Sequence, residues 1–144
     1  MSLRLPPRIK VLEALGAVVD GRVRLVGEGR CEVVSSEGDR VYNVVVEGGF
    51  VYSNDNGTLY RGYVGYPILA CLMAEGKLPI DAELGEKLRG VPWRRLNEQY
   101  KRYEEVLKRI YAERGIERER AEAYIDAVLR CLAAMRLRLK KPTG

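Results

Sequence analysis

Residues 17–53 contain short runs of valine and tyrosine separated by turns that contain glycine, and this pattern limits the fold more than any other feature. Valine and tyrosine suit the half-buried surface of a pleated sheet. Asp20-Gly21 and Gly48-Gly49 are two-residue turn signals flanked by such runs, and residues 17–20 are expected as the strand before the first turn. Because connections this short join antiparallel neighbours, we expect a meander of about four or five antiparallel strands.

Helices are predicted on both sides of this sheet along the chain. Pro6-Pro7 begin a short helix that Gly16 ends. Residues 53–58 form a polar loop of residues that tolerate positive φ, and such loops often carry binding contacts. Residues 67–76 then form a predominantly apolar helix, which we expect to be buried against the sheet.

The second half of the chain is predicted to be helical. Residues 81–89 form a short helix, and apolar residues at spacings of three and four indicate one longer helix that begins near Trp93. Gly115 breaks that helix, and a last helix begins near Glu117. Two helices joined through a glycine of this kind are expected to form an αα-hairpin.

These elements predict an α+β fold with an N-terminal helix, a small antiparallel sheet, a buried helix packed on the sheet, and a C-terminal αα-hairpin. Residues 1–80 are expected to form the α+β core, and residues 81–144 a helical extension packed on it. A chain of 144 residues of which 47% are hydrophobic can bury such a core without disulfides or metal ions.

Composition suggests a compartment and a source. No apolar run approaches the roughly 20 residues that span a bilayer, and the first residues lack the apolar segment of a secretory signal. We therefore expect a cytoplasmic protein with no membrane partner. Glutamine occurs once and asparagine four times, while 31% of the residues are charged. Few thermolabile amides and many mixed charges are typical of hyperthermophile proteins, which favours an archaeal thermophile as the source.

The residue types of common catalytic and metal sites are missing. The sequence has no histidine, so no Ser-His-Asp triad is possible and the commonest metal ligand is lacking. Cys31, Cys71 and Cys131 are widely spaced among apolar residues, and we expect three buried free thiols rather than a disulfide framework or a zinc site. No P-loop is present. The sequence therefore predicts no cofactor, no metal and no enzymatic activity.

Residues 42–74 follow the order strand, tight turn, strand, polar loop, tyrosine-rich connection and buried helix. The residues that carry a family likeness are Tyr42 and Val44 in the first strand and, in the helix, Ile68, Leu69, Ala70, Leu72 and Met73. In this arrangement the segment resembles the SWIM zinc-finger domain, a ββα unit. Its pattern is Cys-x-Cys, a variable gap, and Cys-x-His at the start of a helix that continues aliphatic-aliphatic-alanine.

The zinc ligands of that domain are replaced in this chain. The four ligand positions are held by Tyr52, Asn54, Gly65 and Pro67, and these residues cannot make a zinc site. The resemblance therefore implies a metal-free relative in which tyrosine packing replaces the metal. SWIM domains are associated with DNA-binding and protein-interaction roles, so the resemblance also implies a nucleic-acid or protein partner.

Positive charge is concentrated toward the C-terminus. Residues 92–144 hold 14 Lys and Arg against 8 Asp and Glu, whereas residues 1–91 have a net charge of −1. A basic segment without acidic residues is typical of a surface that contacts polyanions, although cations at a helix end also suit the helix dipole. The candidate phosphate contacts are Arg130, Arg136, Arg138, Lys140 and Lys141.

A second candidate cluster combines aromatic rings with a cation. Tyr60, Arg61, Tyr63 and Tyr66 are close together in the chain, and aromatic residues with arginine form stacking platforms for single-stranded nucleic acid. The alternative is that these tyrosines pack across a sheet edge with their hydroxyls at the rim. Trp93 is expected to anchor its helix, while Arg94 and Arg95 face outward and either touch phosphate, pair with glutamates one turn on, or make no contact.

The leading hypothesis is a non-catalytic binding module that contacts DNA, RNA or a nucleic-acid-associated protein complex. The second is a structural or assembly protein that oligomerises or binds a protein partner through an apolar stripe on its C-terminal helices, which includes Leu129, Leu132, Met135 and Leu139. The third is an enzyme that uses an unrecognised acid or base among the tyrosines and carboxylates.

Overall fold

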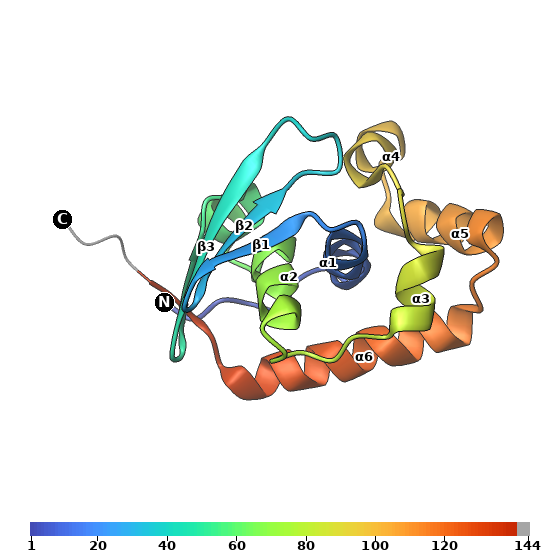
Figure 1. Cartoon of the computed structure of the whole chain (residues 1–144). Coiled ribbons are helices and arrows are strands. Elements are labelled where there is room, and N and C mark those ends of the chain that lie inside the picture. The colour runs from blue at the N-terminus through green and yellow to red at the C-terminus, as the bar shows by residue number, and fades with distance from the viewer. Residues whose placement is uncertain (141–144) are drawn as a thin grey trace.

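A five-stranded sheet with one helix packed on it forms the centre of the fold (Figure 1). The computed structural model describes residues 1–140. The strands lie in chain order, and their bounds are β1 Val23–Gly27, β2 Arg30–Val34, β3 Val41–Glu47, β4 Phe50–Ser53 and β5 Arg138–Leu139. The first four strands form an antiparallel meander, and β5 joins the edge parallel to β4. The predicted α+β class is confirmed.

The helices cover one face of this sheet. Their bounds are α1 Ile9–Val19, η1 (a π-helix) Gly57–Arg61, α2 Tyr66–Ala74, α3 Ala82–Lys87, α4 Trp93–Gln99, α5 Tyr103–Arg114 and α6 Arg118–Met135. The buried helix α2 packs on β1 to β4, and α1 packs on the other side of α2. Figure 1 shows α3, α4 and α5 beyond α1, and α6 running along one side of the domain. None of the helices in residues 1–140 combines the length and the apolar character that crossing a membrane requires.

Alternation along the strands explains which face of the sheet is covered. Cys31 and Val33 of β2, Val44 of β3 and Val51 of β4 are buried, while the residues between them are more exposed. Side chains point alternately to the two faces of a strand, so this set lies on one face. That face meets α2, whose residues from Pro67 to Met73 are all buried.

The first predicted hairpin is wrong. Residues 17–19 continue α1, and Asp20-Gly21 end this helix instead of turning between two strands. Gly21 has a φ of 70°, and the amide of Arg22 donates to the carbonyl of Ala17, as at many helix ends. The sharp turn that joins β1 to β2 contains Gly29, whereas the predicted turn at Gly48-Gly49 is confirmed.

The long helix predicted from Trp93 is interrupted. Tyr100 and Arg102 adopt extended backbone angles, so α4 ends at Gln99 and α5 begins at Tyr103. The predicted break at Gly115 is confirmed, because this glycine has a left-handed conformation at the end of α5. The following helix, α6, packs against α1.

The expectation of three buried free thiols is wrong. Cys31 on β2 and Cys71 on α2 form a disulfide across the interface between sheet and helix, with their Cα atoms 5.9 Å apart. Cys131 is free and exposed on α6. Strand alternation turns Cys31 toward the helix layer, and α2 presents Cys71 there, so residues 40 positions apart meet.

Candidate functional site

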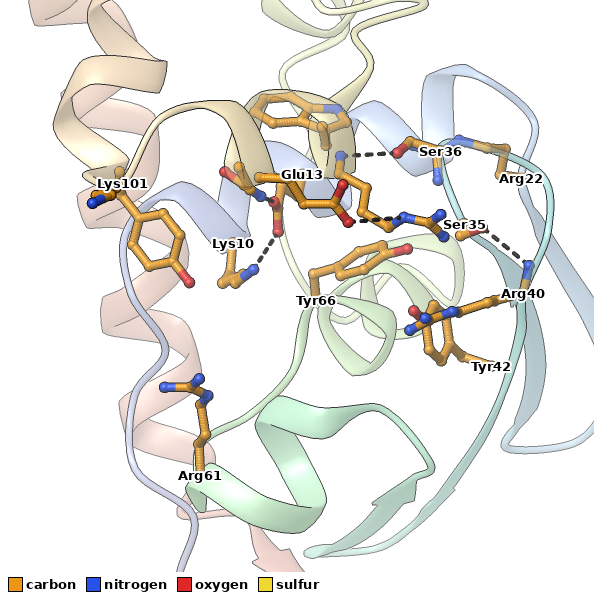
Figure 2. Close-up of a pocket in the computed structure, with 15 residues that line it drawn as sticks. Lys10, Glu13, Arg22, Ser35, Ser36, Arg40, Tyr42, Arg61, Tyr66 and Lys101 are labelled. Carbon is orange, nitrogen blue, oxygen red and sulfur yellow. Dashed lines mark hydrogen bonds and ion pairs between the residues drawn. The ribbon is translucent and has the colours of Figure 1, made fainter.

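A cavity of about 580 Å³ opens where α1, α4, the start of α2 and the connection between β2 and β3 meet (Figure 2). Its volume is within the range of small-molecule pockets, which hold on the order of 300–1,000 Å³. Six cationic side chains and two carboxylates line it. They are Lys10, Arg22, Arg40, Arg61, Arg94 and Lys101, together with Glu13 and Glu98.

The deepest charged group of this pocket is Glu13 on α1. Its side chain is almost fully buried, and Lys10 Nζ lies 3.0 Å from Oε2. Asn97 on α4 donates a hydrogen bond from Nδ2 to Oε1 of Glu13. Burial opposes the charge of Lys10, but the nearby Glu13 carboxylate outweighs that effect and raises the pKa of Lys10 above its usual value. Lys10 therefore keeps its positive charge at neutral pH.

Arg22 and Tyr66 form a second polar group in the wall of the pocket. Nη1 of Arg22 donates to the carbonyl of Val34 at 2.7 Å, and Nε lies 3.4 Å from Oδ2 of Asp20. Burial raises the pKa of Tyr66 above its usual value, so its hydroxyl stays protonated. The Tyr66 ring meets the ring of Tyr42 edge to face, with their centroids 6.0 Å apart.

The connection between β2 and β3 is clamped to α4. The amide of Arg94 donates to Ser36 Oγ at 3.1 Å, and Nη1 of Arg94 donates to Oδ1 of Asp39 at 2.6 Å. This hydrogen bond lowers the pKa of Asp39 to about 2. Arg94 also lies 3.5 Å from Oε1 of Glu98. Of the alternatives left open for Arg94, the structure shows the pair with a glutamate one turn on, and its charge is balanced within the protein.

Buried polar atoms without a partner gather around this pocket. Among residues 1–140, five buried side-chain nitrogen or oxygen atoms have no hydrogen-bond partner, and four of them belong to residues that line it. The four atoms are Glu13 Oε2, Asn97 Oδ1, Arg22 Nη2 and Trp93 Nε1, and of these Glu13 Oε2 has a charge partner in Lys10. An unpartnered buried polar atom destabilises a protein by about 1–3 kcal/mol. Since Trp93 Nε1 faces Gly16 of α1, the acceptor Asn97 Oδ1 and the donor Arg22 Nη2 are the two atoms suited to a polar ligand.

Cations at the mouth of the pocket are also unpaired. Within the part of the chain that the structure describes, Arg40, Arg61 and Lys101 are exposed, and their side chains make no ion pair. Figure 2 shows Lys101 at the upper left of the view, Arg40 at the right and Arg61 at the lower left. These three charges surround the opening and attract an anionic group.

The polar loop at residues 53–58 is largely interior, with Asn54 and Asn56 exposed, and its role as a binding contact stays a prediction. Asp55 is buried and accepts hydrogen bonds from the amide and the hydroxyl of Thr58, at 3.1 Å and 2.8 Å. A β-carbon on Gly65 would overlap the carboxylate of Asp55, so glycine is required there. This network holds η1, the helix that ends in Arg61. A π-helix often occurs at a functional site.

The predicted stacking cluster is only partly brought to this pocket. Arg61 lines it, and Tyr63 is half-buried against Gly57, where burial raises its pKa. Tyr60 is 80% exposed and does not line the pocket. Their role in stacking stays a prediction.

The predicted basic tail lies elsewhere. Arg130 and Arg136 are exposed at the C-terminal end of α6, and Arg138 is exposed on β5. Lys140 pairs with Glu47 at 2.5 Å, and Lys141 lies outside the described residues. None of the four described residues lines the pocket. The basic tail is therefore not part of this pocket.

The apolar stripe proposed for a partner is largely covered by the chain itself. Leu132 is buried in the core, and Leu129 and Met135 pack against it. Leu139 lies on β5 and lines a separate shallow cavity beside Phe50. Leu132 is thus not accessible to another molecule, while Leu129, Met135 and Leu139 are partly exposed.

Most of the pocket was not identified from the sequence. Its residues come from five separate stretches of the chain, and neither Glu13 nor Asn97 belongs to a recognisable motif. The one usable signal is the position of Glu13 among the apolar residues of α1, because a carboxylate is almost never fully buried unless it is paired. Among the described residues, no three His, Cys, Asp or Glu side chains form a group that could hold a metal ion.

Fold and pocket together define a single α+β unit with a basic, polar cavity between its helices and its sheet. The chain belongs to the family described as uncharacterised conserved protein UCP014422, whose family model matches residues 3–138. No curated protein and no solved structure matches the chain.

Proposed function

We propose that this protein is a non-catalytic binding protein whose pocket holds a phosphate-bearing ligand. The observation that carries the proposal is the coincidence of two features around one cavity. Exposed unpaired cations surround its mouth, and buried unpartnered polar atoms occupy its wall. Each feature is unfavourable for the protein alone, and a ligand that is anionic at one end and polar at the other satisfies both.

Phosphate fits the mouth of the pocket better than a carboxylate does. Arg40, Arg61 and Lys101 supply three positive charges, and a phosphate ester carries up to two negative charges with several acceptor oxygens. Guanidinium groups form paired hydrogen bonds with phosphate oxygens, and a lysine adds a compact charge. The polar wall at Glu13, Asn97 and Arg22 then suits hydroxyl, amine or carbonyl groups on the rest of the ligand.

The state of the titratable groups supports binding rather than proton transfer. A general acid or base works best when its pKa lies near the operating pH. The pKa values of Lys10 and Tyr66 are both raised away from neutrality, so their protonation does not change near pH 7. The sequence has no histidine to take that role. These groups therefore present fixed charges and fixed hydrogen bonds to a ligand.

The phosphate can belong to a free small molecule or to a nucleic acid. We therefore keep nucleic-acid binding, as expected from the sequence, within the proposed function. Its main contact would be the pocket instead of the C-terminal cations. The assembly function is less favoured, because the stripe that would carry it packs on the chain's own core.

We also propose that the protein is cytoplasmic. A disulfide is rare in the cytosol of mesophiles but common in intracellular proteins of hyperthermophiles. The Cys31–Cys71 bond and the low amide content together support a cytoplasmic protein of a thermophile. The proposed compartment is tested by measuring whether Cys31 and Cys71 react with a thiol reagent in protein isolated from its natural source.

Isothermal titration calorimetry tests the function. The titrants are inorganic phosphate, adenosine monophosphate and a single-stranded oligonucleotide, each at low and moderate salt. We expect micromolar binding of at least one phosphate ester, weakened about tenfold or more by Arg61→Gln. The matched control is Arg138→Gln, which removes an exposed arginine that does not line this pocket.

Two outcomes contradict the proposal. If none of the titrants binds at low salt, the pocket does not take phosphate. If Arg138→Gln weakens binding and Arg61→Gln does not, the contact is the basic C-terminal surface instead of the pocket.

A further inference from the structure

Tyr103, the first residue of α5, lines two cavities. One is the pocket described above, and the other is a cavity of about 470 Å³ between the start of α1, α5 and α6. The side chain of Tyr103 is 41% exposed, so it stands at the surface between the two cavities. The residues lining the second cavity include Arg8, Lys108, Tyr111 and Arg118.

The second cavity repeats the chemistry of the first. Of the five buried polar atoms without a partner in residues 1–140, the fifth is the hydroxyl of Tyr111, and Tyr111 lines this cavity. Every such atom therefore belongs to a residue in one of the two cavities beside Tyr103. Burial raises the pKa of Tyr111 to about 12, so its hydroxyl is neutral at pH 7 and can both donate and accept a hydrogen bond.

The second cavity, like the first, has unpaired cations in its lining. Lys108 and Arg118 are exposed, and neither forms an ion pair among the described residues. Arg8 donates hydrogen bonds to Glu122 and to Asp126, so it is not an unpaired cation. Glu104 is the remaining carboxylate in the lining of this cavity. The lining thus keeps a small positive balance, and the positive surface extends past Tyr103.

The ring of Tyr103 is held in place between the cavities. Lys10 Nζ lies 5.3 Å from the ring centroid, within the range of a cation–π contact. Because Lys10 is also paired with Glu13, the ring is tied to the most buried part of the first pocket. The exposed part of the ring remains accessible to a flat group that stacks on it.

From this arrangement we infer that the natural ligand is a single-stranded oligonucleotide that extends past Tyr103, with one nucleotide in each cavity. The inference rests on the proposed function and names its ligand. Positive charge that follows a path, aromatic rings along that path and polar groups between them are the features that bind single strands. Cavities of this size take one unpaired nucleotide each, whereas the bases of a duplex are stacked and paired and cannot enter them.

A length series tests the inference. The affinities of adenosine monophosphate, the dinucleotide and the tetranucleotide are measured by competition against a labelled oligonucleotide, as RNA and as DNA. We expect the dinucleotide to bind at least tenfold more tightly than the mononucleotide. The slope of log affinity against log salt should grow by about 0.7 for each added phosphate contact.

Three variants separate the second cavity from the first. Lys108→Gln, Tyr111→Phe and Tyr103→Ala should each reduce the gain that the dinucleotide shows, and Lys108→Gln and Tyr111→Phe should leave the mononucleotide affinity unchanged. Arg130→Gln, an exposed arginine on α6 outside both cavities, is the control and should change neither. Circular dichroism and the unfolding midpoint of each variant confirm that it is folded.

The outcomes distinguish the two proposals. If the mononucleotide binds in the pocket as tightly as the longer strands, the second cavity is not a subsite, and the inference fails while the proposed function stands. If Lys108→Gln weakens the mononucleotide and the dinucleotide equally, the two cavities do not bind separate units, and the inference fails as well. If no phosphate compound binds, both fail.

Discussion

The indole of Trp93 packs directly against Gly16 of α1. A β-carbon built on Gly16 would lie 2.7 Å from Nε1 of Trp93, closer than such atoms approach in real structures. Gly16 is therefore the contact point at which α4 rests on α1. Since Asn97 and Arg94 follow Trp93 on α4, this contact also sets the position of one wall of the pocket.

Replacing Gly16 with alanine should destabilise the protein. Alanine favours a helix by about 1 kcal/mol over glycine, so this change would be stabilising if space were available. The clash with Trp93 instead forces α4 to shift, and overpacking of this kind typically destabilises by about 1–3 kcal/mol. Denaturant unfolding measures the free energy. The fluorescence of Trp93, the only tryptophan, reports the shift.

Gly49→Ala is the matched control for this change. Gly49 lies in the turn between β3 and β4, and no atom lies within 4 Å of the position that its β-carbon would take. Its stability should stay within about 0.5 kcal/mol of the parent protein. An increase in stability for Gly16→Ala would contradict the packing described here.

Local signals were sufficient for the parts of the fold that local interactions determine. The turn at Gly48-Gly49 and the buried helix beginning at Pro67 follow from adjacent residues, and both are confirmed. Asp20-Gly21 shows the limit of such signals, because the same dipeptide suits a hairpin turn and the end of a helix. Packing of α1 against α2 decides between them, and that contact is not visible in the sequence.

The pocket could not be predicted from local sequence patterns. Lys10, Arg40, Arg61 and Lys101 are separated by at least 20 residues from one another along the chain, and only the tertiary structure brings them around one opening. Arg61 was identified because it stands among tyrosines, which is a local pattern. The C-terminal cations are also a local pattern, because they follow one another closely in the sequence. In the structure, the described ones do not line the pocket.

Reduction of the disulfide should lower the stability of the protein substantially. The bond between Cys31 and Cys71 closes a loop of 40 residues. Loop-closure entropy assigns about 4 kcal/mol to a cross-link of this length. Unfolding in urea with and without a phosphine reductant measures the difference. The double variant Cys31→Ala with Cys71→Ala should show a similar loss.

Thiol counting gives an independent check of the same bond. The folded protein should contain one reactive thiol, Cys131, because this residue is exposed and free. Cys131→Ser should remove that reactivity and leave the unfolding midpoint nearly unchanged. Three titratable thiols in denatured protein that was never reduced would contradict the disulfide.

Glu13→Gln should weaken the buried ion pair at the base of the pocket. Removing one partner of a fully buried pair destabilises by roughly 3–5 kcal/mol, and we expect about 2 kcal/mol because Lys10 keeps some contact with solvent. The pKa of Lys10 should fall, since the Glu13 carboxylate is what raises it. Chemical denaturation measures the stability. Heteronuclear NMR of the lysine side chain follows the pKa.

The double variant Lys10→Met with Glu13→Leu is the control for that pair. Replacing both members of a buried ion pair with apolar residues is often nearly neutral. This variant should therefore lose less stability than Glu13→Gln alone. A greater loss in the double variant would show that hydrogen bonding to Asn97, rather than charge, determines the stability of this region.

Stability should decline as the pH rises above about 10. The pKa values of Lys10, Tyr66, Tyr111 and Tyr124 are raised in the folded protein, whereas the unfolded chain titrates near pH 10. Above that pH the folded state binds more protons than the unfolded state, so the stability that these groups contribute is lost as pH approaches their folded values. Ultraviolet titration of tyrosinate together with circular dichroism should show late ionisation coupled to unfolding.

Tyr111→Phe should increase the stability of the ligand-free protein while weakening binding of longer ligands. The hydroxyl of Tyr111 is buried without a partner, and removing such a group relieves a desolvation penalty of about 1–3 kcal/mol. Phenylalanine keeps the ring that packs in the core, so no cavity opens beyond the lost oxygen. A rise in the unfolding midpoint, together with a loss of dinucleotide affinity, would indicate that this atom is retained for a ligand. A fall in the midpoint would mean that the hydroxyl has a stabilising partner within the protein or its solvent, and the second cavity would lose its main polar contact.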